Sequence, residues 1–227
     1  MPLWYVFCIM AFMGSETRPP AEAAEVIKRL KKAYPEARIA LKYGSPMELL
    51  VATILSAQAT DVKVNEVTAK LFKNYRGVND YADADPGEFE QDIRQTGFYR
   101  NKAKNIIRSA GIIRESFGGQ VPRTMAELVT LPGVARKTAN IVLYNAYGVV
   151  DGIAVDTHVG RLSQRLGLST NKDPVKIEKD LMKQIPQKEW GGFSYLLIDH
   201  GRAICTAIRP KCGDCLLNDI CPSAFRV

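Results

Sequence analysis

A chain of 227 residues that is 46% hydrophobic and 24% charged is long enough and apolar enough for one large globular domain or two modest ones. It carries 31 Lys and Arg against 24 Asp and Glu, a formal net charge of +7. This excess permits a polyanionic partner such as nucleic acid. Charge alone does not separate a nucleic-acid-binding protein from an ordinary basic one.

The chain begins with MPLWYVFCIMAFMGSE, in which about twelve residues are apolar. That run is too short to span a bilayer. It also lacks the basic residues and the small-residue cleavage site expected of a secretory signal. We expect residues 1–15 to be an N-terminal extension of unknown role, either a mis-assigned start or an accessory segment. No other stretch looks membrane-spanning, so we expect a cytoplasmic protein without a membrane partner.

Apolar residues recur at helical spacing along most of the chain. The stretch PMELLVATILSAQ, residues 46–58, is apolar almost all round and predicts a core helix. Steps of three and four residues predict amphipathic helices within 64–75 and 103–117. Two Asp-Pro pairs, at residues 85–86 and 173–174, are typical of helix starts. No sustained apolar-polar alternation is present, so the predicted fold class is all-α.

The stretch TMAELVTLPGVARKTANIVLYNAYG, residues 124–148, predicts two helices joined by a tight glycine turn. Thr124 and Glu127 have capping-box spacing, and the first helix is expected to end at the Leu-Pro-Gly of residues 131–133. The second helix is expected to begin near Val134 or Ala135. Its first backbone N–H groups could bind a phosphate without reading sequence. The alternative is a plain helical hairpin with no ligand.

Two charged residues follow this turn at positions suited to chemistry. Lys137 falls in the first turn of the second helix, where the helix dipole and Arg136 disfavour a protonated ammonium. An unprotonated amine is a potential nucleophile, and the alternative is a solvated or phosphate-binding lysine. Asp156 follows three apolar residues and precedes an amphipathic helix. It is placed to cap that helix, and its charge could also stabilise a cation on a nearby sugar.

Four of the five cysteines crowd into seventeen residues near the C-terminus with the spacing C-x6-C-x2-C-x5-C. They are Cys205, Cys212, Cys215 and Cys221. A disulfide framework does not fit a cytosolic chain, so we interpret the cluster as a metal site. Zinc usually takes thiolates from paired C-x2-C knuckles, whereas an iron–sulfur cluster accepts ligands spread along a loop. The spacing favours the cluster without excluding zinc.

Two cations, Arg209 and Lys211, lie between the first two of these cysteines. A metal-fixed loop that projects them would suit phosphate contact. The alternative is that they only offset the thiolate charge.

Taken together, the cysteine spacing, LPGVARKTAN, VDTHVGRL and LSAQATD resemble endonuclease III, the family of helix-hairpin-helix DNA glycosylases and abasic-site lyases. The resemblance extends over residues 20 to 222. It implies two helical lobes with a DNA cleft between them. One lobe is a six-helix barrel of residues 39–149, with the hairpin at about 124–147. The other joins residues 16–38 to 150–227 and carries a [4Fe-4S] cluster.

The resemblance also implies roles for individual residues. Lys137 falls at the family's nucleophile and Asp156 at its catalytic aspartate, while the four clustered cysteines fall at its cluster ligands. Gln58 matches the residue that fills the gap left by a flipped base, and Phe98, in TGFYRNKA, falls at an apolar wedge.

The remaining DNA contacts are expected from Leu131, Gly133 and Ala135 of the hairpin and from Arg209 and Lys211. The family commonly has glycine where this chain has Ala135. Alanine would be strained there if the site needs a positive φ, and harmless if it only begins the helix.

By this resemblance we expect a bifunctional enzyme of base excision repair that acts as a monomer on double-stranded DNA with damaged bases or abasic sites. It would remove oxidised pyrimidines through a lysine Schiff base and cut the strand by β-elimination. In a prokaryote it would be cytoplasmic and associated with the nucleoid. One alternative is a monofunctional mismatch glycosylase, a class that generally lacks a lysine at position 137. Another is a non-catalytic, metal-stabilised DNA-binding module.

Overall fold

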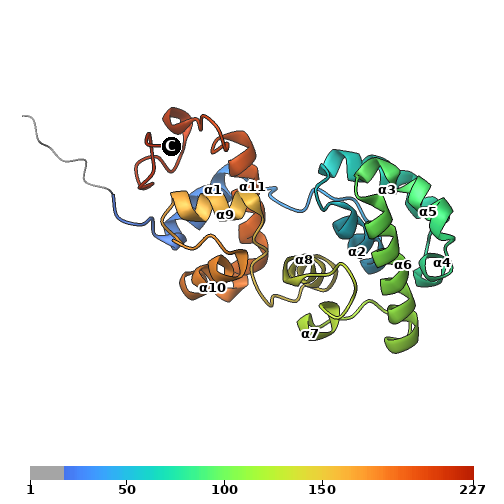
Figure 1. Ribbon diagram of the computed structural model, residues 1–227. Helices are drawn as coiled ribbons and strands as arrows, with labels where there is room; N and C mark the ends of the chain where they lie inside the picture. Colours follow the sequence, from blue (N-terminus) through green and yellow to red (C-terminus); the bar gives the residue numbers. More distant parts are fainter. Residues whose placement is uncertain (1–17) are drawn as a thin grey trace, which may run out of the picture.

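The computed structural model describes residues 18–227, and every regular element in that range is a helix (Figure 1). This confirms the all-α prediction. The predicted extension, residues 1–15, lies outside the described part of the chain. Within that part, no helix combines the length and the apolar character that crossing a bilayer requires.

The helices follow one another with short connections, and η marks the short 3₁₀ turns. In chain order they are α1 (Ala23–Ala33), α2 (Pro46–Leu55), α3 (Asp61–Asn74), α4 (Val78–Ala82), α5 (Pro86–Asp92), η1 (Arg94–Thr96), α6 (Tyr99–Ser116), α7 (Met125–Leu128), α8 (Arg136–Tyr147), α9 (Thr157–Arg165), α10 (Pro174–Gln184), η2 (Gln187–Glu189), α11 (Trp190–Ala203) and η3 (Cys212–Asp214). Both Asp-Pro pairs begin helices as predicted, with the aspartate accepting a backbone N–H bond in α5 and α10.

Helices α2 to α8 enclose one hydrophobic core, formed by buried side chains between Leu41 and Leu143, and we call this part the barrel lobe. Helix α2 lies at its centre and packs on α3, α6 and α8. Nearly all of its side chains are buried, as its apolar sequence predicts. The helix begins where the Ser45 hydroxyl accepts a bond from the Glu48 amide. It stops at Leu55 rather than continuing to residue 58, because Gln58 has a φ of 54° that a right-handed helix does not allow.

A second core joins the two ends of the described chain, and we call this part the cluster lobe. Buried residues of α1 meet residues between Ile153 and Leu217 from α9, α10, α11 and the C-terminal segment. Figure 1 shows α1, α9 and α10 grouped with the C-terminal segment on one side, and α2 to α6 on the other. The division of the chain into residues 39–149 and residues 16–38 with 150–227 stays a prediction. The first core lies within residues 39–149, and the second is formed by residues from the other two segments.

Candidate functional site

Helices α7 and α8 form the predicted hairpin. Thr124 caps α7, as the sequence predicts: its Oγ1 accepts from the Glu127 amide at 3.3 Å. The Glu127 carboxylate accepts from the Thr124 hydroxyl at 2.6 Å rather than from its backbone N–H, so only the first half of the capping box is formed. The turn between the helices is attached to α6, because the Ser109 hydroxyl donates to the Pro132 carbonyl at 3.0 Å. This side-chain bond attaches the turn to the barrel lobe.

Leu131, predicted to contact DNA, is a buried residue of the turn, so any contact that it makes would not come from its side chain. The side chain is only 2% exposed and packs in the barrel core. Its backbone N–H donates to Leu128 and its carbonyl accepts from Val134, so both groups are engaged in the turn. Burial of an apolar side chain is more favourable in free energy than its contact with a charged phosphate backbone. Leu131 therefore anchors the turn to the barrel core.

The glycine and the alanine of the turn differ in their backbone conformation. Gly133 has a φ of +79°, and a Cβ there would lie 2.9 Å from Nδ2 of Asn105, so both conformation and space require glycine. Ala135 has a φ of −90° and a ψ of 170°, which is the extended backbone of a helix N-cap. Alanine is therefore unstrained where the family commonly has glycine. In the part of the chain that the structure describes, neither of these two amides donates a backbone hydrogen bond.

Lys137 is the second residue of α8, which begins at Arg136, and its side chain is exposed. It therefore lies at the positive end of the helix, in the first turn, which is the position that the sequence predicts. The neighbouring Arg136 is directed elsewhere: its Nε donates to Oε2 of Glu178 at 2.8 Å, and its Nη2 lies 3.4 Å from Oδ1 of Asp151. Glu178 is buried, so this ion pair offsets the charge of Arg136.

Asp156 caps α9, as the sequence predicts. Its Oδ1 accepts from the Val159 amide at 2.8 Å, and buried Ile153 and Val155 fix the segment before it. Gly152 in the same segment packs so closely on α8 that a Cβ would lie 2.9 Å from both Arg136 Nη2 and Asn140 Nδ2. Gly152, four residues before Asp156, therefore lies against side chains from the first turns of α8, the helix that carries Lys137.

Gln58 and Phe98 share an uncommon feature. Both are exposed, Phe98 by 65%, and both have left-handed backbones, with φ values of 54° and 49°. Residues other than glycine seldom adopt this conformation, and it is often found at functional sites. Gln58 lies just after α2, and Phe98 lies just before α6. A side chain that the sequence analysis did not single out, Lys102, bonds to the backbone at both places.

The four C-terminal cysteines line one pocket, each of them partly buried. Arg165 Nη1 lies 3.3 Å from the Cys205 sulfur, and His200 Nε2 lies 3.4 Å from the Cys215 sulfur. Burial raises the pKa of Cys215 to about 11, and a bound metal would favour its thiolate form. Four thiols spread around one pocket suit a larger body, which fits an iron–sulfur cluster.

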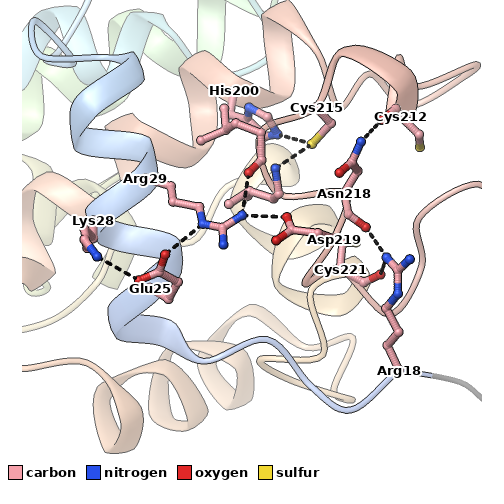
Figure 2. A network of polar contacts seen from close by, with 12 residues as sticks. Arg18, Glu25, Lys28, Arg29, His200, Cys212, Cys215, Asn218, Asp219 and Cys221 are labelled. Atoms are coloured by element: carbon pink, nitrogen blue, oxygen red, sulfur yellow. Dashed lines mark hydrogen bonds and ion pairs between the residues drawn. The ribbon is translucent and has the colours of Figure 1, made fainter.

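Helix α1 holds this cysteine loop from outside (Figure 2). Arg29 Nη1 donates to the Leu216 carbonyl at 2.9 Å and to Asp219 at 2.5 Å, while its Nε donates to Glu25 at 2.9 Å. Hydrogen bonds to these two carboxylates raise the pKa of Arg29 and lower those of Asp219 and Glu25. Arg18 adds bonds to the carbonyls of the same loop. The N-terminal helix thus fixes the backbone between the third and fourth cysteines.

Arg209 and Lys211 are exposed on the loop between Cys205 and Cys212. Arg209 has a left-handed φ of 55°, and the neighbouring Ile208 is 81% exposed. The loop is closed at its base by the Lys211 amide, which donates to the Ile204 carbonyl at 3.0 Å. Both cations therefore lie where a phosphate could reach them.

Comparison with known proteins gives the family. A sequence profile described as "HhH-GPD superfamily base excision DNA repair protein" matches residues 51–187, which is more than half of the chain. A second, described as "Iron-sulfur binding domain of endonuclease III", matches residues 205–221. Endonuclease III of Synechocystis sp. is 56% identical over 202 residues, covering 89% of this chain and 92% of the relative. The chain belongs to the endonuclease III family. The expected [4Fe-4S] cluster is thereby confirmed as its cofactor.

Two solved structures of endonuclease III extend the likeness to the whole fold. One is a non-covalent endonuclease III–DNA complex, with a TM-score of 0.83 and 45% identity, covering 87% of this chain and 92% of that one. The other is a trapped endonuclease III–DNA covalent intermediate, also with a TM-score of 0.83 and 45% identity, covering 87% and 93%. The predicted endonuclease III fold is confirmed, while the roles of individual site residues remain predictions.

Proposed function

We propose that this chain is a bifunctional DNA glycosylase and abasic-site lyase of base excision repair, acting as a monomer on double-stranded DNA. Its family membership and its likeness to a trapped endonuclease III–DNA covalent intermediate support this activity. The observation that carries it is the placement of an exposed Lys137 in the first turn of α8, with Asp156 at the start of the next helix, after a segment whose Gly152 packs on α8.

DNA would lie between the two lobes and be held mainly through its phosphates. The amides of Gly133 and Ala135, at the positive end of α8, would anchor one phosphate. A duplex hides the glycosidic carbon, so the damaged nucleotide must leave the stack. Gln58 and Phe98 are exposed on adjoining loops and would occupy the vacated space.

Lys137 would supply the nucleophile. Its neutral amine attacks C1′ of the sugar, a C1′–N bond to the enzyme forms, and the glycosidic bond breaks with its electron pair leaving on the base. Asp156 stabilises the positive charge that develops on the sugar and accepts the proton released by the lysine, which then passes to the departing base. The ring opens to a Schiff base, loss of a C2′ proton follows, and the C3′–O bond breaks. This β-elimination cuts the strand on the 3′ side of the lesion.

The cluster pocket would serve binding rather than chemistry. When bound, a [4Fe-4S] cluster ties its four cysteines together and fixes the loop that carries Arg209 and Lys211. These two cations would then meet phosphates outside the reacting nucleotide.

Oxidised pyrimidines are the substrates we propose. The alternative of a monofunctional mismatch glycosylase is not favoured, because this chain has Lys137 exposed at the helix position where such enzymes generally lack a lysine. A non-catalytic binding module is not favoured either, because the matched family consists of repair enzymes.

Borohydride trapping on duplexes with a panel of damaged bases tests both the chemistry and the substrate class. A reduced, covalent protein–DNA adduct should form with thymine glycol and other oxidised pyrimidines. Lys137→Gln should abolish the adduct but leave DNA binding in place, because the hairpin amides remain. Lys73→Gln, at an exposed lysine in the last turn of α3, is the matched control and should trap like wild type. Undiminished trapping by Lys137→Gln would assign the chemistry to another amine.

A further inference from the structure

The ammonium group of Lys102 joins the two loops that carry Gln58 and Phe98. Lys102 lies in the first turn of α6, and the residue is only 5% exposed. Its Nζ donates to the Leu55 carbonyl and to the Thr96 carbonyl, both at 2.8 Å. One buried cation therefore connects two segments that are far apart in the sequence.

The two accepting carbonyls are at the roots of the two loops. Leu55 is the last residue of α2, three positions before Gln58, and Thr96 is the last residue of η1, two positions before Phe98. Carbonyls at the C-terminal end of a helix lack partners within the helix and lie at the negative end of its dipole. A cation placed between two such ends satisfies both, which no apolar side chain could do.

The backbone of Lys102 reinforces the second connection. Its amide donates to the Phe98 carbonyl at 3.2 Å, the first bond of α6. Its side chain then turns back to Thr96, so the residue bonds on either side of Gly97. The Phe98 backbone, which is in the left-handed conformation, is thus held from both directions.

Packing alone does not account for a lysine at this position. The described ion pairs do not include Lys102, and its burial lowers the pKa of the ammonium below its ordinary value. Burying a charge without a counter-ion has a desolvation cost, which the bonds to the two carbonyls offset. The other buried positions of α6 are apolar apart from Ser109, and among them are Ala103, Ile106 and Ala110. The feature that distinguishes Lys102 is the pair of loops that it connects.

We propose that Lys102 is a positioning residue that fixes the placement of Gln58 relative to Phe98, so that both enter the opened DNA stack together. This inference rests on the proposed function, in which these two side chains fill the space left by the extruded nucleotide. Insertion presses both loops back toward the barrel, and the shared ammonium resists their separation. Its contribution belongs to duplex substrates, because single-stranded DNA has no paired stack to hold open.

The test compares Lys102→Met with wild type on one abasic-site sequence presented as duplex and as single strand. Methionine keeps the length of the side chain and removes both donors. The borohydride-trapping rate should fall roughly 10- to 100-fold on the duplex, as expected for the loss of charged hydrogen bonds, and stay within about 3-fold on the single strand. Both substrates meet the same preparation, so the ratio of the two rates does not depend on the fraction of folded enzyme.

A second measurement places Lys102→Met in the Gln58→Ala, Phe98→Ala background. If Lys102 acts through those two side chains, Lys102→Met should lower the duplex trapping rate little further in the double-alanine background. Independent effects on the rate would instead add in free energy. Fluorescence of 2-aminopurine beside the lesion should also report less opening of the stack by Lys102→Met than by wild type. Lys102→Arg, which keeps charge and donors, should recover a substantial part of the duplex rate.

An equal fall on duplex and single strand would overturn the proposal, and so would an undiminished loss in the double-alanine background. A wild-type enzyme that traps neither substrate would instead refute the proposed lyase activity, leaving the two failures distinct.

Discussion

Arg136 on α8 and Glu178 on α10 form an ion pair across the two lobes, with 2.8 Å between Nε and Oε2. Asn140, one turn further along α8, donates to the other oxygen of Glu178 at 2.9 Å. Both oxygens of this buried carboxylate are therefore engaged by the helix that carries Lys137. A second pair, between Arg202 on α11 and Asp61 on α3 at 2.7 Å, connects the lobes on the Gln58 side.

Gly152→Ala should disturb the first of these connections. A Cβ at this position would lie 2.1 Å from Oε1 of Glu178, in a network that leaves the carboxylate little freedom to move. We expect a loss of ~1–3 kcal/mol in the free energy of unfolding, the usual range for overpacking, together with slower base excision. Urea denaturation and single-turnover excision measure the two effects.

Gly111→Ala is the matched control for that change. Gly111 lies within α6, and nothing lies within 4 Å of the position of its Cβ. Alanine there should stabilise the protein by about 0.5–1 kcal/mol. Equal changes in the free energy of unfolding for Gly152→Ala and Gly111→Ala would mean that the Glu178 carboxylate can move aside at no cost.

The hairpin turn should tolerate one substitution and reject the other. Gly133→Ala forces a left-handed alanine against Asn105 and should cost ~1–2 kcal/mol or more, while weakening the affinity for DNA. Ala135→Gly changes an extended N-cap residue and should alter stability by less than about 0.5 kcal/mol. Thermal unfolding and binding to an abasic duplex test the contrast. A tolerated Gly133→Ala would show that the turn can adopt another backbone conformation.

Two substitutions at Asp156 should separate its capping from its charge. Asp156→Asn keeps an oxygen for the Val159 amide, so stability should be nearly unchanged while excision slows by about 10²–10³, as for other preorganised electrostatic groups. Asp156→Ala also removes the cap and should cost a further ~1 kcal/mol of stability. If Asp156→Asn excised the base at the wild-type rate, the charge of Asp156 would have no role in catalysis and its function would be limited to capping α9.

Removal of Arg29 should loosen the cluster. Arg29→Met loses the bonds to Leu216 and Asp219 that hold the loop between the third and fourth cysteines, so the visible absorbance of the cluster should bleach faster under chelator and air. Lys28→Met is the control, since in the described part of the chain the polar contact of Lys28 is with Glu25 and not with the cysteine loop. Identical bleaching of both variants would show that the helix does not protect the cluster.

DNA affinity should fall steeply with salt, because the proposed contacts are mainly to phosphates and release counterions. Arg209→Ala and Lys211→Ala should each reduce the slope of log K against log salt by about one unit if each meets one phosphate. The double variant should show both reductions. A wild-type slope in the double variant would place this loop away from the DNA.

Local patterns in the sequence were enough for the hairpin, the caps and the all-helical fold. Thr124 with Glu127 and the two Asp-Pro pairs are read from spacing of a few residues, and the structure confirms the helix starts that they predict. The extent of α2 was not predictable in this way. Its apolar run continues past Leu55, and only the surrounding structure fixes Gln58 in the left-handed conformation that ends the helix.

Contacts between distant segments were beyond the sequence. Lys102 carries one available signal, a charged residue on the buried face of an amphipathic helix, but that signal does not identify its acceptors. Arg29 meets a carbonyl 187 residues away, and Arg136 meets a carboxylate 42 residues away. Pairs of this kind depend on how helices pack, which helical periodicity leaves open.

The mixed origin of the cluster lobe also sets an order for events during synthesis. The barrel core is complete once Leu143 has been made, whereas the second core needs both α1 and residues as late as Leu217. A nascent chain therefore holds α1, with Val26 and Leu30 unburied, while the barrel folds behind it. The four clustered cysteines follow the barrel lobe in the chain, so a cluster can bind them only after the α7–α8 hairpin has been made.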